Sequence, residues 1–221
     1  VSHRAHASTV GVAEILPSYA GTLLTSEIEH LSDVMENPKR PLLSIVAGSK
    51  VSTKIGVLKA LAKLSDTLII GGALGTTFNY AQGAKVGNSL YEADQKENAL
   101  EILEYAKQHN CQVLLPLDKG VAKVFERDAV LTNKDFTEIE PDDVIIDAGV
   151  ATTQRDTDAI RAARTVIWNG TVGMAEWQPT WSYGSFALAQ TIAEQTASAH
   201  SKVLQARCLN FVRDLVLIMR L

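Results

Sequence analysis

The chain has 221 residues, 46% of them hydrophobic, and a formal net charge of −4 at pH 7. This length and composition allow one large or two small globular domains with a sizeable core. The negative net charge gives no general attraction to nucleic acid or to anionic membranes, so an anion-binding site has to be local. Cys111 and Cys208 are too few and too far apart in sequence for a disulfide framework or a zinc site.

Targeting segments are not visible in the sequence. No N-terminal stretch combines a basic flank with an apolar core, and no run reaches the roughly 18 uninterrupted apolar residues of a membrane helix. We therefore expect a cytoplasmic protein without a membrane or nucleic-acid partner. The chain begins at Val1 without an initiator Met, and we expect it to be cut from a longer protein.

Residues 26–36 are the first predicted helix. Apolar side chains recur there at helical spacing, and Ser26 can cap the first turn. Pro38 and Pro41 follow, and proline cannot continue a helix because it lacks the backbone N–H.

The stretch from Leu43 to Lys54 points to phosphate binding. An apolar strand runs through Gly48 into a predicted helix over 51–64, and the start of such a helix favours a bound anion through its unpaired N–H groups and its dipole. Lys50 and Lys54 lie one helical turn apart and should share a face, where their ammonium groups could hold different phosphates of one nucleotide.

Two known phosphate-binding motifs are excluded for this stretch, and one structural alternative remains. The stretch is neither a Walker A loop nor the dinucleotide-binding fingerprint, because the Gly-Lys-Ser/Thr ending of the first and the further glycines of the second are missing. The structural alternative is a turn with two solvated lysines.

Four later apolar runs predict further buried strands, and helical patterns fill the intervals. The strands are expected over 67–72, 112–117, 143–149 and 165–170, the helices over about 76–82, 95–109, 154–164 and 183–197, and residues 200–204 could open another strand. Continuous apolar runs bounded by glycine are typical of parallel strands covered on both faces. The alternation predicts an α/β fold with a doubly wound parallel sheet, Rossmann-like in its three α/β/α layers.

The interval between Lys119 and Asp143 is more polar. Its acidic residues gather around Pro141 and are Glu138, Glu140, Asp142 and Asp143. We interpret them as a solvated turn in preference to a metal site, because runs of charge are usually solvated.

Glycine recurs where four of the predicted strands end. These glycines are Gly48, Gly71–Gly72, Gly149 and Gly170. Doubly wound sheets bind ligands outside the carboxyl ends of their strands, where glycine lets the backbone approach a ligand closely. The alternative is that the glycines only begin loops, but their recurrence on one edge predicts a nucleotide crevice.

Seven segments together resemble the phosphoglycerate kinase family, chiefly its carboxyl-terminal nucleotide-binding domain. They keep the family's order and spacing and read HRAHAS at 3–8, GSKVSTK at 48–54, IIGG at 69–72, GNSL at 87–90, LLPLD at 114–118, VIWNG at 166–170 and GMAE at 173–176. The resemblance implies glycolytic, reversible phosphoryl transfer from 1,3-bisphosphoglycerate to ADP, giving 3-phosphoglycerate and ATP. It also implies Mg²⁺ as the cofactor and a monomeric, normally two-domain kinase.

The resemblance also implies roles for individual residues. Lys50 matches the lysine that contacts the phosphoryl group in flight, and Lys54 matches the lysine that binds nucleotide phosphates. Asn169 is similar to a nucleotide-phosphate contact, and Glu176 to the carboxylate on the ribose hydroxyls. Lysines suit this chemistry, because phosphoryl transfer needs charge compensation and alignment more than covalent catalysis.

Two further binding roles follow from the same resemblance. Gly48, Gly72 and Gly149 are expected to line the adenosine slot. Arg4 matches an arginine that reaches the phosphoglycerate from near the domain junction.

The sequence departs from the family at both ends. The family's amino-terminal domain supplies a basic patch and a catalytic arginine for the phosphoglycerate, and only Arg4 remains here. After Leu204 the family has Gly-Gly-Gly-Asp-Thr, whose Asp binds the metal, whereas this chain continues Gln-Ala-Arg-Cys-Leu-Asn. A coding frameshift or a misjoined end would produce such a tail.

Three segments are expected on this basis. They are a hinge-proximal segment over 1–25, a nucleotide-binding α/β domain over 26–204, and an atypical tail over 205–221. The tail carries no metal ligand of the family's kind, and it is apolar enough to pack on the sheet edge as a helix or to remain an exposed patch.

For the 221 residues we expect nucleotide binding with little turnover, because the acceptor arginines and the metal Asp are missing. One alternative is a nucleotide-binding pseudoenzyme or regulatory module without kinase activity. Another is a different doubly wound enzyme, such as a nicotinamide-dependent dehydrogenase, which would need the absent glycine fingerprint.

Overall fold

The computed structural model describes the backbone of residues 5–175, 182–198 and 216–220. The chain divides into two units, Val1–Asn37 and Pro38–Leu221. The first unit contains a short π-helix, η1 (Ala7–Gly11), and the helix α1 (Thr22–Glu36), which ends at the predicted residue. Among the described residues, no helix combines the length and the apolar character that crossing a lipid bilayer requires.

The second unit is built on a five-stranded sheet in the order β3-β2-β1-β7-β8. Its four parallel strands are β3 (Gln112–Leu114), β2 (Thr67–Gly71), β1 (Leu42–Ala47) and β7 (Thr165–Asn169). Each lies within an apolar run that the sequence predicts to be a strand. The parallel core of the predicted fold is therefore confirmed.

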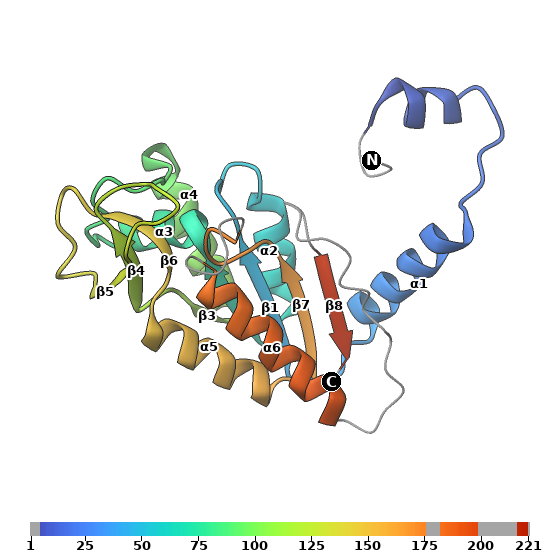
Figure 1. The fold of residues 1–221 in the computed structure, drawn as a ribbon. Coiled ribbons are helices and arrows are strands. Elements are labelled where there is room, and N and C mark those ends of the chain that lie inside the picture. Colours follow the sequence, from blue (N-terminus) through green and yellow to red (C-terminus); the bar gives the residue numbers. More distant parts are fainter. Residues whose placement is uncertain (1–4, 176–181, 199–215, 221) are drawn as a thin grey trace. The chain divides into compact units, whose positions relative to one another are not determined.

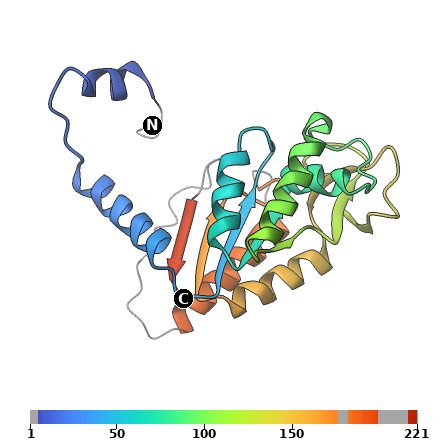
Figure 2. The ribbon, with the colours of Figure 1, turned by 180° about the vertical axis from the view of Figure 1, so that it is seen from behind.

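Helices cover both faces of this sheet. Figure 1 shows α5 (Val150–Ala162) and α6 (Tyr183–Ser198) on one face. Figure 2, seen from behind, shows α2 (Ile55–Leu64) and α4 (Lys96–Gln108) on the other, where α4 also packs beside α3 (Gly72–Ala81) and follows the short η2 (Ala93–Gln95). The three layers match the predicted doubly wound α/β fold.

The central strand β1 shows why the apolar runs fold in this way. All six of its residues are buried, and Leu43, Ile45 and Ala47 join the core formed with α5 and α6. Full burial of a Leu or Ile side chain stabilises a fold by about 1.5–3 kcal/mol. Ser44 tolerates the same burial because its hydroxyl hydrogen-bonds the hydroxyl of Ser65 at 2.7 Å.

The polar interval folds as a separate antiparallel sheet in the order β5-β4-β6. Its strands are β4 (Asp118–Ala122), β5 (Thr132–Asp135) and β6 (Val144–Ala148). The strand predicted at 143–149 exists, but its assignment to the parallel sheet is wrong. An apolar run identifies a strand without identifying the strand that pairs with it. The pairing strand β4 could not be predicted from an apolar run, because it contains polar residues.

The tail supplies the edge strand β8 (Val216–Arg220), which runs antiparallel to β7 with Val216 opposite Asn169 and Arg220 opposite Thr165. Of the two alternatives left open for the tail, this segment takes the sheet edge, but as a strand instead of a helix. A strand satisfies the open backbone hydrogen bonds of β7, which a helix could not do. The strand predicted at 200–204 lies outside the described residues.

Candidate functional site

Glycines bring three loops together at the carboxyl end of the parallel strands. A Cβ on Gly72 would lie 2.9 Å from the carbonyl oxygen of Gly48 and 3.3 Å from that of Thr171, and a Cβ on Gly170 would overlap the carbonyl of Ala47. Gly72 and Gly170 also have positive φ angles, of 65° and 86°. Both features require glycine, so three of the predicted strand-end glycines do meet at one edge.

Backbone hydrogen bonds lock these loops. Gly72 donates its N–H to the carbonyl of Val172 at 3.1 Å, and Leu74 donates its N–H to the carbonyl of Gly48 at 2.8 Å. These amides at the start of α3 are therefore used within the protein. A ligand at this edge has to be held mainly by side chains and by the start of α2.

Two predicted phosphate-binding residues meet at the same edge. Lys54 is the N-cap residue of α2, and its Nζ donates a hydrogen bond to the Oδ1 of Asn169 at the end of β7. The Cε of Lys54 lies 3.5 Å from the position of a Cβ on Gly48. The fold therefore joins the crevice glycines to a cation and an amide that are 115 residues apart in sequence.

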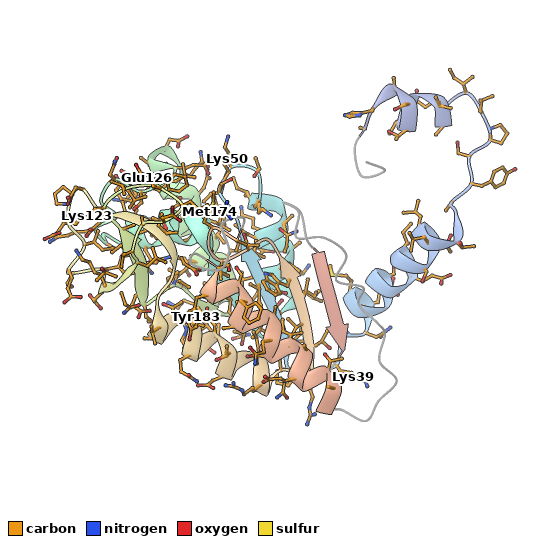
Figure 3. All side chains as sticks on the ribbon, in the orientation of Figure 1. Lys39, Lys50, Lys123, Glu126, Met174 and Tyr183 are labelled. Carbon is orange, nitrogen blue, oxygen red and sulfur yellow. The ribbon has the colours of Figure 1, made fainter. Side chains whose placement is uncertain are left out.

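Lys50 does not lie on the helix with Lys54. The helix α2 begins at Ile55, and residues 48–54 form a loop that ends in a turn. The prediction that the two lysines share a helix face is therefore wrong. Figure 3 shows Lys50 on this loop, where its side chain is exposed.

Tertiary contacts explain the late start of α2. Val51 is fully buried, and Ser52 donates hydrogen bonds from its N–H at 3.1 Å and its Oγ at 2.7 Å to the carboxylate of Glu92. These anchors hold the chain between Lys50 and Lys54 in a path that is not helical.

The remaining predicted site residues lie elsewhere. Gly149 follows β6 and begins α5, where a Cβ would lie 2.6 Å from the Oδ1 of Asn133 and overlap Asp118. Its predicted place on the same edge as Gly48 is wrong, because β6 belongs to the second sheet. Arg4 and Glu176, predicted for substrate and ribose, lie outside the described residues.

The acidic turn does not fit a magnesium site. Among the described residues one group of acids could bring oxygens together around a metal ion, formed by Glu140, Asp142 and Asp143. Lys123 and Lys134 already hold it, with ammonium groups 2.9 and 2.8 Å from the two carboxylate oxygens of Asp143. Ammonium groups at these oxygens compete directly with a cation, so Mg²⁺ has no place in this cluster.

Asp143 corrects the prediction of a solvated turn. Glu140 and Asp142 are exposed as expected, but the side chain of Asp143 is only 1% exposed. Burial alone would raise its pKa, but hydrogen bonds from Lys134, from the Glu140 N–H and from Lys123 outweigh burial and lower the pKa to about 2. The turn is thus held to the second sheet by ion pairs of Asp143 with Lys123 and Lys134.

We expect Asp143→Asn to weaken the fold in a pH-dependent way. The folded-state pKa of about 2 lies below the ordinary value of 3.8, so the ionised carboxylate stabilises the fold fully above about pH 4 and loses this effect as the pH falls toward 2. Urea unfolding of both proteins should therefore show a stability difference at pH 6 that shrinks toward pH 2. A stability difference independent of pH would contradict a stabilising role for the ionised carboxylate of Asp143.

A second ionic group is buried between β4, β6 and α5, and it is absent from the sequence-based predictions. Lys119, Asp147 and Asp156 are 1, 2 and 3% exposed. Burial lowers the pKa of Lys119 to about 8, opposed by the nearby Asp147, Asp156 and Asp118. Burial raises the pKa of Asp147 and of Asp156 to about 6, opposed by backbone N–H groups at Asp147 and by Arg155 at Asp156.

One signal in the sequence could have revealed this group. Lys119 stands two residues before the apolar Val121, and Asp147 ends the apolar run of β6. Charged residues of opposite sign inside neighbouring strands indicate a buried group of charges, but only once the strands are known to be neighbours.

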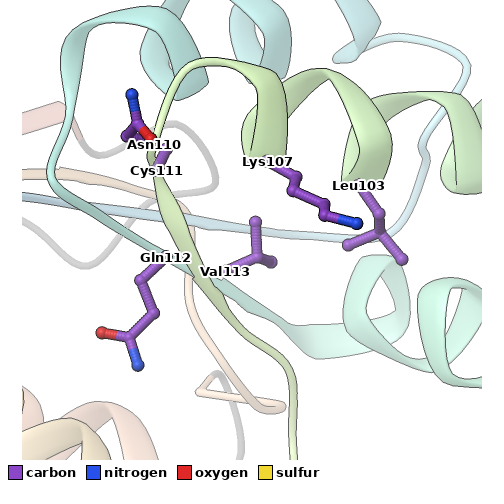
Figure 4. Close-up of a pocket in the computed structure, with 6 residues that line it drawn as sticks. All are labelled: Leu103, Lys107, Asn110, Cys111, Gln112 and Val113. Carbon is purple, nitrogen blue, oxygen red and sulfur yellow. The ribbon is translucent and has the colours of Figure 1, made fainter.

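The thiol of Cys111 is not a candidate nucleophile. Figure 4 shows the hollow beside it, lined by Leu103, Lys107, Asn110, Cys111, Gln112 and Val113. Burial, and next the charge of Asp66, raise the pKa of the Cys111 thiol to about 11, so it is protonated and unreactive at neutral pH.

Comparisons with known proteins identify the family of this chain. A profile of the phosphoglycerate kinase family matches residues 1–209. The phosphoglycerate kinase of Legionella pneumophila (strain Corby) is 45% identical over 197 residues, which is 89% of this chain and 50% of the relative. That of Methylorubrum populi is 43% identical over 195 residues, which is 88% of this chain and 48% of the relative.

Solved structures give the same result. The structure of phosphoglycerate kinase from Coxiella burnetii has a TM-score of 0.80 and 40% identity, and covers 88% of this chain and 50% of that one. The enzyme from Pyrococcus horikoshii OT3, at 23% identity and a TM-score of 0.68 over 88% of this chain and 49% of that one, shares the fold. The chain spans about half the length of the curated relatives it matches, and it belongs to the phosphoglycerate kinase family.

Proposed function

We propose that this chain is the nucleotide-binding half of a cytoplasmic, glycolytic phosphoglycerate kinase. The whole protein would transfer a phosphoryl group reversibly between 1,3-bisphosphoglycerate and ADP, giving 3-phosphoglycerate and ATP. The observation that carries the proposal is the contact between Lys54 and Asn169 beside Gly48, at the carboxyl end of a parallel sheet. Family membership supports it and removes the dehydrogenase alternative.

Lys54 and Asn169 suit a nucleotide phosphate chemically. Because the Oδ1 of Asn169 accepts the bond from Lys54, its Nδ2 is presented as a donor. An ammonium and an amide N–H₂ side by side give charge and direction to phosphate oxygens. The start of α2 adds the positive end of its dipole.

Lys50 is proposed to stabilise the phosphoryl group in transfer. Its exposed side chain stands on the anchored loop between β1 and α2, four residues before Lys54. Charge compensation and alignment account for most of the catalysis of phosphoryl transfer, so a mobile cation on a fixed loop is suited to this role.

Magnesium is proposed to enter with the nucleotide, as MgADP or MgATP. Among the described residues, the cluster of three acids does not fit it, since Lys123 and Lys134 hold that cluster. The phosphoglycerate substrates are proposed to bind through the other half of the protein, with Arg4 and Glu176 completing the phosphoglycerate and ribose contacts.

Lys54→Ala is expected to weaken ADP binding about 10- to 100-fold, because a charged hydrogen bond contributes about 1.5–3 kcal/mol. Isothermal titration of the 221-residue chain with ADP measures this. Lys63→Ala is the matched control, since Lys63 is an exposed lysine in the last turn of the same helix, far along it from Lys54. Equal ADP affinity in wild type and Lys54→Ala would remove the nucleotide site from this edge.

Turnover by the 221 residues is a separate question. We propose that they bind nucleotide with little kinase activity, because the sequence after Leu204 lacks the family's Gly-Gly-Gly-Asp-Thr and the chain spans half of its relatives. Loss of proximity and orientation can remove about 7–11 kcal/mol of barrier lowering. A coupled assay should detect no turnover, and turnover at the rate of a complete kinase would contradict this.

A further inference from the structure

The carboxylate of Asp147 caps the helix α6. Asp147 is 2% exposed on β6. Its Oδ2 accepts the N–H of Gly184 in the first turn of α6 at 2.9 Å, and its Oδ1 accepts the N–H of Ala148 at 2.8 Å. A carboxylate at a helix N-terminus satisfies unpaired N–H groups and complements the dipole. Asp147 therefore ties the second sheet to α6.

The loop after β7 packs on the same carboxylate. A Cβ on Gly173 would lie 2.9 Å from the Cβ of Asp147 and would overlap its carboxylate. A Cβ on Gly184 would lie 2.8 Å from the Oδ1. Only glycine fits at either position, so the loop and the start of α6 close around one side chain.

This loop also borders the proposed nucleotide site. Val172 accepts the N–H of Gly72 at 3.1 Å and donates its own N–H to the Oγ of Ser185 at 3.1 Å. Met174 donates its N–H to the carbonyl of Ile146 at 3.1 Å. The loop follows Asn169 directly, so its placement determines where that side chain stands.

The charge of Lys119 favours the ionised form of Asp147, as do the N–H groups that this carboxylate accepts. In the register of β4 with β6, Lys119 lies opposite Ala148, and Gly120 lies opposite Asp147. Both charged side chains are buried. An ionised carboxylate accepts both N–H groups, which a protonated one does less well.

We propose that Asp147 is a positioning residue that fixes the loop 170–174 and so holds Asn169 against Lys54. The proposal rests on the proposed nucleotide site. Asp147 does not touch the nucleotide; it acts through the loop.

The test compares Asp147→Asn with wild type and with Asp156→Asn. Asp156 is a buried carboxylate near the same lysine, but it lies on α5 and its hydrogen bonds go to Arg155. Asparagine at 147 can accept only one of the two N–H groups. We expect about tenfold weaker ADP binding and about tenfold faster amide exchange at Gly184 and Met174 for Asp147→Asn, and neither change for Asp156→Asn.

Each outcome decides between the proposals. Wild-type ADP affinity and amide exchange in folded Asp147→Asn would overturn the positioning role alone, and so would equal losses in both variants. A wild-type chain that does not bind ADP would overturn the proposed function and this inference with it. If Asp147→Asn does not fold, the Lys119→Met/Asp147→Asn variant, which also removes the buried positive charge near residue 147, gives the same comparison.

Discussion

Lys119→Met is expected to lower the free energy of unfolding by about 3–5 kcal/mol, because it removes the positive charge near the buried carboxylates of Asp147 and Asp156. At pH 7 the lysine is charged and Asp147 and Asp156 are ionised, since their pKa values are about 8, 6 and 6. The substitution preserves most of the apolar length of the side chain. Urea unfolding at pH 7, followed by circular dichroism, measures the loss.

Two matched variants separate charge from packing. Lys119→Met/Asp147→Asn should recover part of the lost stability, because it also removes the buried carboxylate of Asp147. Lys63→Met removes an exposed lysine in the last turn of α2 and should cost less than about 1 kcal/mol. If Lys119→Met costs no more than Lys63→Met, the buried charge of Lys119 does not stabilise this fold.

Gly170→Ala is expected to cost about 2–4 kcal/mol, the second largest effect. Gly170 has a φ of 86°, where an L-residue is strained by about 1–2 kcal/mol, and its Cβ would overlap the carbonyl of Ala47 at the end of β1. The backbone of two strands would have to separate at the nucleotide edge. Urea unfolding gives the cost, and ADP titration should show weaker binding.

Gly83→Ala is the control for Gly170→Ala. Gly83 has a similar φ of 93°, but no heavy atom lies within 4 Å of its Cβ position. It should therefore show the backbone strain alone, without the overlap. Equal costs at the two positions would mean that the close approach of β1 and the loop after β7 is not what requires glycine at 170.

The parallel core could be predicted because its information is local. Strands β1, β2 and β7 are mostly apolar, and burial on both faces favours this composition. The resemblance to the family pointed to Lys54 and Asn169 as phosphate contacts, and parallel strands that end at one edge explain why these two residues meet.

The second sheet could not be predicted in this way. Strand β4 contains the buried Asp118 and Lys119, whose polar and charged neighbours lie far along the chain. Asp118 accepts the N–H groups of Ala151 and Thr152 at 2.9 and 2.8 Å at the start of α5. Polar residues whose burial depends on distant partners look like loop residues in the sequence.

The start of α2 shows how tertiary contacts override local preference. The residues between Lys50 and Lys54 are compatible with a helix. The burial of Val51 and the hydrogen bonds from Ser52 to Glu92, however, stabilise the loop more than one further helical turn would stabilise α2. The prediction was therefore wrong about a shared helix face for the two lysines. Both lysines still lie in the segment that leads into α2.

A crystal structure of the chain soaked with MgADP tests the central claim most directly. The account predicts phosphate oxygens within hydrogen-bond distance of the Nζ of Lys54 and the Nδ2 of Asn169, beside Gly48 and Gly72. An ADP molecule bound at another place, or a crevice that stays empty at saturating ADP with Lys54 still on Asn169, would contradict it.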